Sequence, residues 1–376
     1  MRSKTILTYG ENYFTPLFQE CAMSRLTLAL CLSGLLVLGL AAQGVAQVIV
    51  GQAVAVPALV PAVAAAPAVQ PQCQVFERMA GTWEAQALRV SAETSDQPKP
   101  IGRVTRQWVV EHKFLQERSS QHEAYLTFDP RRNAYCAWYF HANGHVLEMT
   151  GQWTGNWMMF SLSADVDQNQ GLQRNFMVQN DQNHECTVTW TDENGRTGIF
   201  ATLRYARIDA AKADKSANAA SLPKISPPDE MKVFADEIGK WTIEGSAVSG
   251  DKTTKFSGST TAQWILGGRF VQTTATIQGR KGDNICVAGF DAATKTYRCW
   301  YFDSEGSFSE PGVGTWDEKE HTMSWKEKMT SDIVMVKKKQ WIDHDTAKIH
   351  AVYSRPNGSV EATQDGTITR QKAVGG

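Results

Sequence analysis

Two distant stretches of the 376-residue sequence share one pattern, Gly81-Thr82-Trp83 and Gly239-Lys240-Trp241. An apolar Val-Phe pair precedes each of them at the same spacing. Further matched segments follow in the same order: Gln107-Trp108 with Gln263-Trp264, Phe128-Asp129 with Phe290-Asp291, Trp138-Tyr139-Phe140 with Trp300-Tyr301-Phe302, Asn194-Gly195 with Asn357-Gly358, and Arg207 with Arg370. Matches in one order at nearly equal spacing predict an internal duplication, with units at 74–208 and 230–373.

Each unit is predicted to be a series of short antiparallel strands. Residues 186–190 alternate in the strand manner, and both Asn-Gly pairs lie between strand-like runs, which is a strong hairpin signal. Helical character is confined to the start of each unit, around 76–79 and 230–238. We therefore expect an all-β fold of two tandem antiparallel β-barrels, each preceded by a short helix. Closing the meander into a barrel would remove its exposed strand edges.

A short helix followed by Gly-x-Trp is also the opening pattern of lipocalin-like barrels. Together with Gly267-Gly268-Arg269-Phe270, Trp300-Tyr301-Phe302-Asp303 and the closing Thr369-Arg370, it resembles a bacterial family, domain of unknown function family 1579. The resemblance covers most of both units and is closer in the second, since Glu111-His112-Lys113 replaces the Gly-Gly-Arg in the first. It implies a calycin-like barrel for each unit and supplies no reaction.

The N-terminal region has the features of an export signal. Met23-Ser24-Arg25 precedes an apolar run from 26 to 40, and small residues continue to Ala46. Residues 1–46 are thus predicted to be a secretory signal peptide with an upstream extension. We expect a periplasmic or extracellular bacterial protein, which would contact a membrane only if this segment stayed uncleaved as an anchor. Residues 47–73, rich in Ala, Val and Pro, and residues 209–229 are predicted linkers.

The composition argues against several classes of function. Lys+Arg number 38 and Asp+Glu 39, so the formal charge of −1 provides no basic footprint for nucleic acid. No catalytic residue, metal or cofactor is assigned, because no motif for one is present. His141 and His145 bracket a hairpin, but two imidazoles do not make a metal site. His344 and His350 are weak candidates for haem ligation without support from their neighbours.

Aromatic residues on the predicted strands are the candidate ligand-binding residues. They are expected to turn toward the barrel interiors, where they would line a cavity or fill the core. In the first unit they are Trp83, Trp108, Trp138 and Phe140, and in the second Trp241, Trp264, Trp300 and Phe302.

The favoured hypothesis is an exported non-catalytic binding protein for a small apolar or amphipathic ligand in the barrel interior. The alternatives are a structural or protein-interaction module with filled barrels, and an enzyme with a carboxylate or His at a barrel mouth. The oligomeric state stays open.

Two further features of the second unit carry expectations. If residues 291–294 form a four-residue loop, Cys286 lies opposite Cys299, and the two are a candidate disulfide; two buried thiols are the alternative. The run Lys337-Lys338-Lys339 is predicted to lie on a solvated strand edge.

Overall fold

The computed structural model of the chain describes residues 71–90, 98–153, 159–167, 170–192, 194–209, 226–279, 282–292, 294–330 and 332–372. All of these belong to one compact unit, Pro67–Gly376. The predicted signal peptide and most of the two predicted linkers lie outside the described residues. No helix in the described part of the chain is both long and apolar enough to cross a membrane.

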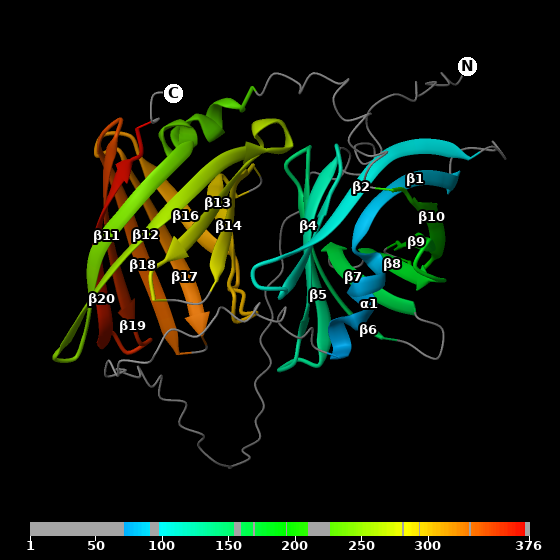
Figure 1. Ribbon diagram of the computed structural model, residues 1–376, viewed down its shortest axis with the longest axis horizontal. Helices are drawn as coiled ribbons and strands as arrows, with labels where there is room; N and C mark the ends of the chain where they lie inside the picture. Colours follow the sequence, from blue (N-terminus) through cyan, green and yellow to red (C-terminus); the bar gives the residue numbers. More distant parts are fainter. Residues whose placement is uncertain are drawn as a thin grey trace, which may run out of the picture. The chain divides into compact units, whose positions relative to one another are not determined.

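The first barrel starts with a short helical segment, η1 (Pro71–Cys73) and α1 (Gln74–Met79). Its strands in the described residues are β1 (Gly81–Val90), β2 (Lys99–Val109), β3 (Phe114–Arg118), β4 (His122–Asp129), β5 (Ala134–His141), β6 (Val146–Trp153), β7 (Met159–Asp167), β8 (Gln170–Val178), β9 (Asn183–Thr191) and β10 (Thr197–Arg207). Each strand pairs antiparallel with the next, and β1 also pairs with β10, which closes the ring (Figure 1).

The second barrel repeats this plan after the 3₁₀ helix η2 (Asp229–Glu237). Its strands are β11 (Gly239–Ser249), β12 (Lys252–Ile265), β13 (Phe270–Ile277), β14 (Asp283–Asp291), β15 (Thr296–Phe302), β16 (Gly312–Asp317), β17 (Thr322–Thr330), β18 (Ile333–Asp343), β19 (Thr346–Ser354) and β20 (Val360–Arg370), with the one-turn helix η3 (Leu266–Gly268) between β12 and β13. Pairing of β11 with β20 closes this barrel as well. The predicted fold, two antiparallel barrels each preceded by a short helix, is confirmed.

The same contacts tie the helical segment to the first and last strands in both barrels. Trp83 donates its indole N–H to the carbonyl of Met79 at 2.8 Å, and the Arg207 guanidinium lies 4.4 Å from the Trp83 ring centre. Arg207 also donates to the carbonyl of Arg78 at 2.9 Å. An arginine at the end of a helical segment satisfies carbonyl groups that have no partner within the helix.

The second barrel makes these contacts with the matched residues. Trp241 donates to the carbonyl of Glu237 at 2.8 Å, Arg370 lies 4.0 Å from the Trp241 ring centre, and it donates to the carbonyl of Ile238 at 2.7 Å. A Cβ at Gly239 would lie 2.7 Å from Nη1 of Arg370, and its φ is +132°. The glycine of each Gly-x-Trp pattern thus makes room for the arginine that ends the last strand.

The predicted inward orientation of four aromatic residues is wrong. Tyr139 of β5 packs with the core of the first barrel, whereas Trp138 and Phe140 on the opposite face pack with Trp300 and Phe302 in a separate cluster that joins the two barrels. Both faces of β5 are buried, so alternation along this strand separates two apolar faces without showing which one is inside.

This second cluster contains reciprocal contacts between matched residues. Ring centres lie 5.3 Å apart in Phe114–Phe302, 5.4 Å in Phe140–Phe270, and 5.1 Å in both Trp138–Phe302 and Phe140–Trp300. The contact of Trp138 with Phe302 is thus repeated, with the barrels exchanged, by the contact of Trp300 with Phe140. Such reciprocity is typical of an isologous two-fold interface. A fully buried polar contact accompanies them, in which Gln272 donates to Glu123 at 2.8 Å.

Substitution of Gly239 by Ala is expected to lower the free energy of unfolding by roughly 2–4 kcal/mol, since it combines backbone strain with displacement of Arg370. Gly250→Ala is the matched control, because Gly250 also has a positive φ, of +55°, but nothing lies within 4 Å of an added Cβ. It should cost roughly 1 kcal/mol. Urea denaturation measures both, and equal losses would show that the arginine contact contributes nothing.

Phe302→Ala is expected to destabilise the protein by roughly 3–5 kcal/mol, because the ring is fully buried against Phe114, Tyr125 and Trp138. Val313→Ala, at a side chain that is 43% exposed, should stay within about 0.5 kcal/mol of the parent protein. Denaturation midpoints compare the two, and a Phe302 variant as stable as the control would contradict burial between the barrels.

Candidate functional site

The interior of the first barrel contains a group of polar and charged side chains that the sequence analysis did not single out. We call it the arginine cluster, and it consists of Arg106, Glu117, His122, Tyr139, Arg174, His184 and Tyr205. They come from seven different strands. Residues that pair directly across two antiparallel strands point to the same face of the sheet. Arg106 pairs with Glu117 and His184 with Tyr205, and Tyr205 belongs to the barrel core. The barrel therefore encloses charge in a mostly apolar core.

Glu117 is held by two neighbours. Arg106 donates from Nε to Oε2 at 2.5 Å, and Nε2 of His122 lies 2.6 Å from Oε1. Burial by itself would raise the pKa of Glu117, but the charge of Arg106 and the hydrogen bond from His122 hold it well below its usual range. Glu117 is thus an anion at neutral pH with both oxygens occupied.

His184 is held in one neutral form. Its Nε2 lies 2.7 Å from Nη1 of Arg106, and since a guanidinium only donates, Nε2 accepts and the proton sits on Nδ1. Burial, and then the positive charge of Arg106, lower the pKa of His184 to about 2. The ring stacks on Tyr205 with a centroid distance of 4.5 Å.

Arg174 is a buried cation that makes no ion pair with any carboxylate of the described residues. The residue is 3% exposed, and its guanidinium lies 4.0 Å from the ring centre of Tyr139. Among the residues that the structure describes, no carboxylate forms an ion pair with it and no acceptor meets its Nε. A buried charge in this state is strongly unfavourable unless something else compensates it.

Other buried donors in the cluster also have no acceptor among the described residues. They are Nη2 of Arg106, Nδ1 of His184 and the hydroxyl of Tyr139. Each buried polar group left without a partner costs roughly 1–3 kcal/mol. A hydrogen-bond acceptor brought to these atoms would supply their missing partner.

The second barrel has different residues at the matched positions. Pairing with the Gly-x-Trp strand places Ala262 where Arg106 stands, and the corresponding pairing of β19 with β20 places Ala347 where His184 stands. Lys337 occupies the position of Arg174 and forms an ion pair with the buried Glu327 at 3.7 Å. The two barrels therefore differ in their interior chemistry.

The eight aromatic residues predicted as ligand-binding are not brought together. Trp83 and Trp241 are fully buried near the helical segments. Trp108 and Trp264 are partly buried against the cores of their own barrels. The other four lie in the cluster between the barrels, as described above. A binding role for any of them stays a prediction.

The expected register of the candidate disulfide is wrong. Asp291 pairs with Thr296, so Lys295, with a φ of +53°, belongs to the turn. Cys286 consequently lies opposite Tyr301, two residues from the position opposite Cys299. Both cysteines are free thiols in this structure. The Cys299 thiol donates to Glu327 at 3.6 Å.

Other sequence candidates occupy unrelated places. His141 is buried in the first barrel while His145 is exposed, and the described residues contain no group of three potential metal ligands. His344 contacts Asp236 and His350 contacts Asp365, and both histidines are exposed.

The predicted solvated strand edge at 337–339 is wrong for two of its three lysines. Lys337 and Lys339 lie on the inward face of β18 together with Trp341. Of the three lysines, only Lys338 is exposed.

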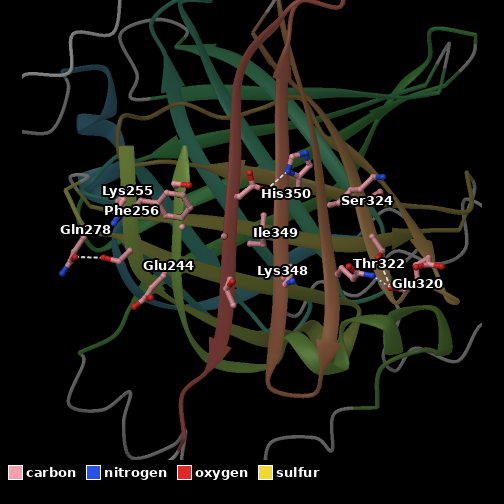
Figure 2. Close-up of a pocket in the computed structure, with 18 of the residues that line it drawn as sticks. Glu244, Lys255, Phe256, Gln278, Glu320, Thr322, Ser324, Lys348, Ile349 and His350 are labelled. Carbon is pink, nitrogen blue, oxygen red and sulfur yellow. Dashed lines mark hydrogen bonds and ion pairs between the residues drawn. The ribbon is translucent and has the colours of Figure 1, made fainter. Parts of the chain in front are cut away.

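A hollow of about 1390 Å³ lies along the second barrel (Figure 2). Its lining includes Lys348 and His350 of β19, which point to the face opposite the buried Ala347. The charged lining side chains are of both signs: Glu244, Lys255, Asp317, Glu320, Lys338, Lys348 and Asp365. These side chains are exposed, so water can solvate them. The hollow lacks the buried, uncompensated donors that distinguish the arginine cluster.

Comparison with known protein families gives a match to the second barrel. Residues 226–370 match the family described as "Protein of unknown function (DUF1579)". No curated protein matches the chain. The match covers the barrel that lacks the arginine cluster.

Several solved structures are similar in fold. The S-type phycobiliprotein lyase CPES from Guillardia theta is 8% identical, with 38% of this chain and 92% of that chain covered and a TM-score of 0.30. Rv2717c from M. tuberculosis is 10% identical, with 39% and 100% covered and a TM-score of 0.32. A protein of unknown function from the DUF3598 family of Nostoc punctiforme is 10% identical, with 81% and 100% covered and a TM-score of 0.26. The likeness concerns fold alone.

Acidification is expected to destabilise the protein partly through His184. The unfolded histidine takes up a proton near pH 6.5, whereas the folded one stays neutral down to about pH 2. The stability present above pH 6.5 is therefore lost as the pH falls, by up to about 1.4 kcal/mol per pH unit. His184→Gln should flatten the slope of unfolding free energy between pH 6 and 4. The exposed His350→Gln is the control, and identical slopes for both variants would contradict the buried neutral state.

Proposed function

We propose that this chain is an exported, non-catalytic binding protein whose first barrel takes a small amphipathic ligand into its interior. The observation that carries the proposal is Arg174, a buried guanidinium whose Nε has no acceptor among the described residues. Stability alone would favour an apolar side chain at this position. A polar group of a ligand would provide the missing partner.

The remainder of the interior suits the apolar part of such a ligand. Small residues face inward from four strands, namely Ala85, Ala124, Ala137 and Ala201. They are part of the buried apolar core of this barrel, so the apolar part of a ligand that entered the interior would meet apolar side chains. Aromatic residues, including Trp83 and Phe176, close the core around them.

Two ionisable groups of the cluster, His184 and Glu117, are poorly suited to acid–base catalysis near neutral pH. A general acid or base works best with a pKa close to the working pH. The pKa of His184 is lowered to about 2, and that of Glu117 is held below its usual range. Both oxygens of Glu117 are also engaged. These features support binding without chemistry.

Export is the second part of the proposal. It is supported by the basic residue, apolar run and small residues between Met23 and Ala46. Those residues lie outside the part of the chain that the structure describes.

Arg174→Leu is expected to act in opposite directions on stability and binding. Without ligand, removal of the uncompensated charge should raise the free energy of unfolding by roughly 1–3 kcal/mol. The same variant, purified from its own host, should lose a small molecule that native mass spectrometry detects on the parent protein.

Lys337→Leu at the matched position of the second barrel is the control. It should lower the free energy of unfolding by roughly 1–3 kcal/mol, because Glu327 is left buried without its ion pair, and it should keep the small molecule. A parent protein that carries no molecule, together with an Arg174 variant that is less stable than the parent, would refute a binding role for the first barrel.

A further inference from the structure

The second barrel holds two cysteines on the inward face of neighbouring strands. Cys286 of β14 lies opposite Tyr301 of β15, and Cys299 of β15 lies opposite Ala288 of β14. The two cysteines are therefore diagonal neighbours, and both contribute to the core of this barrel. Both are free thiols. The arrangement places two soft metal ligands side by side inside one barrel.

The two thiols interact directly with each other and with a buried carboxylate. The pKa of Cys299 is raised well above its ordinary value, first by a hydrogen bond with the Cys286 thiol and then by burial. Cys299 also donates to Oε1 of Glu327 at 3.6 Å. Gly312 leaves room for this group, since a Cβ there would lie 2.7 Å from Sγ of Cys299 and 2.5 Å from Cγ of Glu327. Cys299 is 2% exposed whereas Cys286 is only partly buried, so one of the two thiols is open to an incoming ion.

The register of Cys286 and Cys299 suits an ion between the sulfurs better than a disulfide. Diagonal neighbours across two strands lie roughly 7–8 Å apart, somewhat less between their Cβ atoms, whereas the Cβ atoms of a disulfide are about 3.5–4.5 Å apart. A metal ion bound by both sulfurs inserts two bonds of about 2.3 Å in place of one S–S bond of about 2.0 Å. The ion therefore bridges diagonal cysteines with less movement of the strands.

The number and softness of the ligands indicate which ion fits. Thiolates favour soft ions such as Cu(I), while zinc in proteins is almost always held by four ligands. Cys286 and Cys299 supply two, and the described part of the chain contains no group of three potential metal ligands. Cu(I) has a filled d shell and accepts two thiolates without further ligands.

We propose that Cys286 and Cys299 bind one Cu(I) ion as a two-coordinate thiolate site inside the second barrel. Binding forms two sulfur–copper bonds and releases two protons. The Cys299 proton passes to Glu327, which already accepts its hydrogen bond, and the Cys286 proton leaves to solvent. The complex of Cu(I) with two thiolates carries one negative charge. Lys337, whose Nζ lies 3.7 Å from Oε1 of Glu327, provides the compensating positive charge.

Competition with the chromogenic Cu(I) chelator bicinchoninate, on the full chain under anaerobic reducing conditions, tests this site. The parent protein should bind one Cu(I) per chain, and Cys286→Ala and Cys299→Ala should each weaken binding at least about a hundredfold, because one thiolate remains. Alanine suits these positions, since Ala124 and Ala137 occupy the matched places in the first barrel. Cys136→Ala is the control at a buried thiol of another cluster, and it should leave binding unchanged.

X-ray absorption at the copper edge provides a readout on the parent protein itself, and it should show two sulfur ligands. Copper affinity that is equal in the parent and in Cys299→Ala would overturn the inference. A Cys286–Cys299 disulfide in the host-purified protein, detected by mass spectrometry, would do the same, as would Zn²⁺ bound through these thiols as tightly as Cu(I). If the alanine variants fail to fold, the absorption spectrum decides, and ligands other than two sulfurs refute the site. None of these outcomes bears on ligand binding by the first barrel.

Discussion

In each barrel, one arginine at the end of the last strand ties the helical segment to the two strands whose pairing closes the ring. Arg207 and Arg370 cover the indole of the Gly-x-Trp tryptophan and donate to carbonyls at the end of the helical segment. These contacts join the two strands whose pairing completes the ring. Closure gives every strand an inner and an outer face, and the remaining features of the molecule follow from which side chains lie on each.

On the outer face, closure produces an interface between the barrels. β5 and β15 contribute apolar residues on both sides, so that Tyr139 belongs to a barrel core while Trp138, on the opposite face, packs against the other barrel. The reciprocal ring contacts show that matched surfaces meet there. A contact of this kind excludes water from the aromatic rings without using the interior of either barrel.

On the inner face, the two barrels have different chemistry. The first encloses two arginines against one carboxylate, and the second holds a lysine paired with a glutamate at the matched position. A buried charge without a close counter-ion lowers the stability of a fold, whereas an ion pair offsets part of that cost. The two barrels thus share a fold and differ in the charge that they enclose.

The sequence by itself determined the local pattern: a short helix, Gly-x-Trp, many short strands, Asn-Gly turns and a closing arginine, all present twice. These signals are local, because turn chemistry and alternation depend on neighbouring residues. Only the tertiary structure decided which face of each strand is inside, so the sequence misplaced Trp138 and its partners and shifted the pairing of Cys286. The arginine cluster was missed for the same reason. Arg106 in phase with Trp108 was a hint, but seven strands supply the cluster, and barrel closure alone brings Arg106 against His184, 78 positions along the chain.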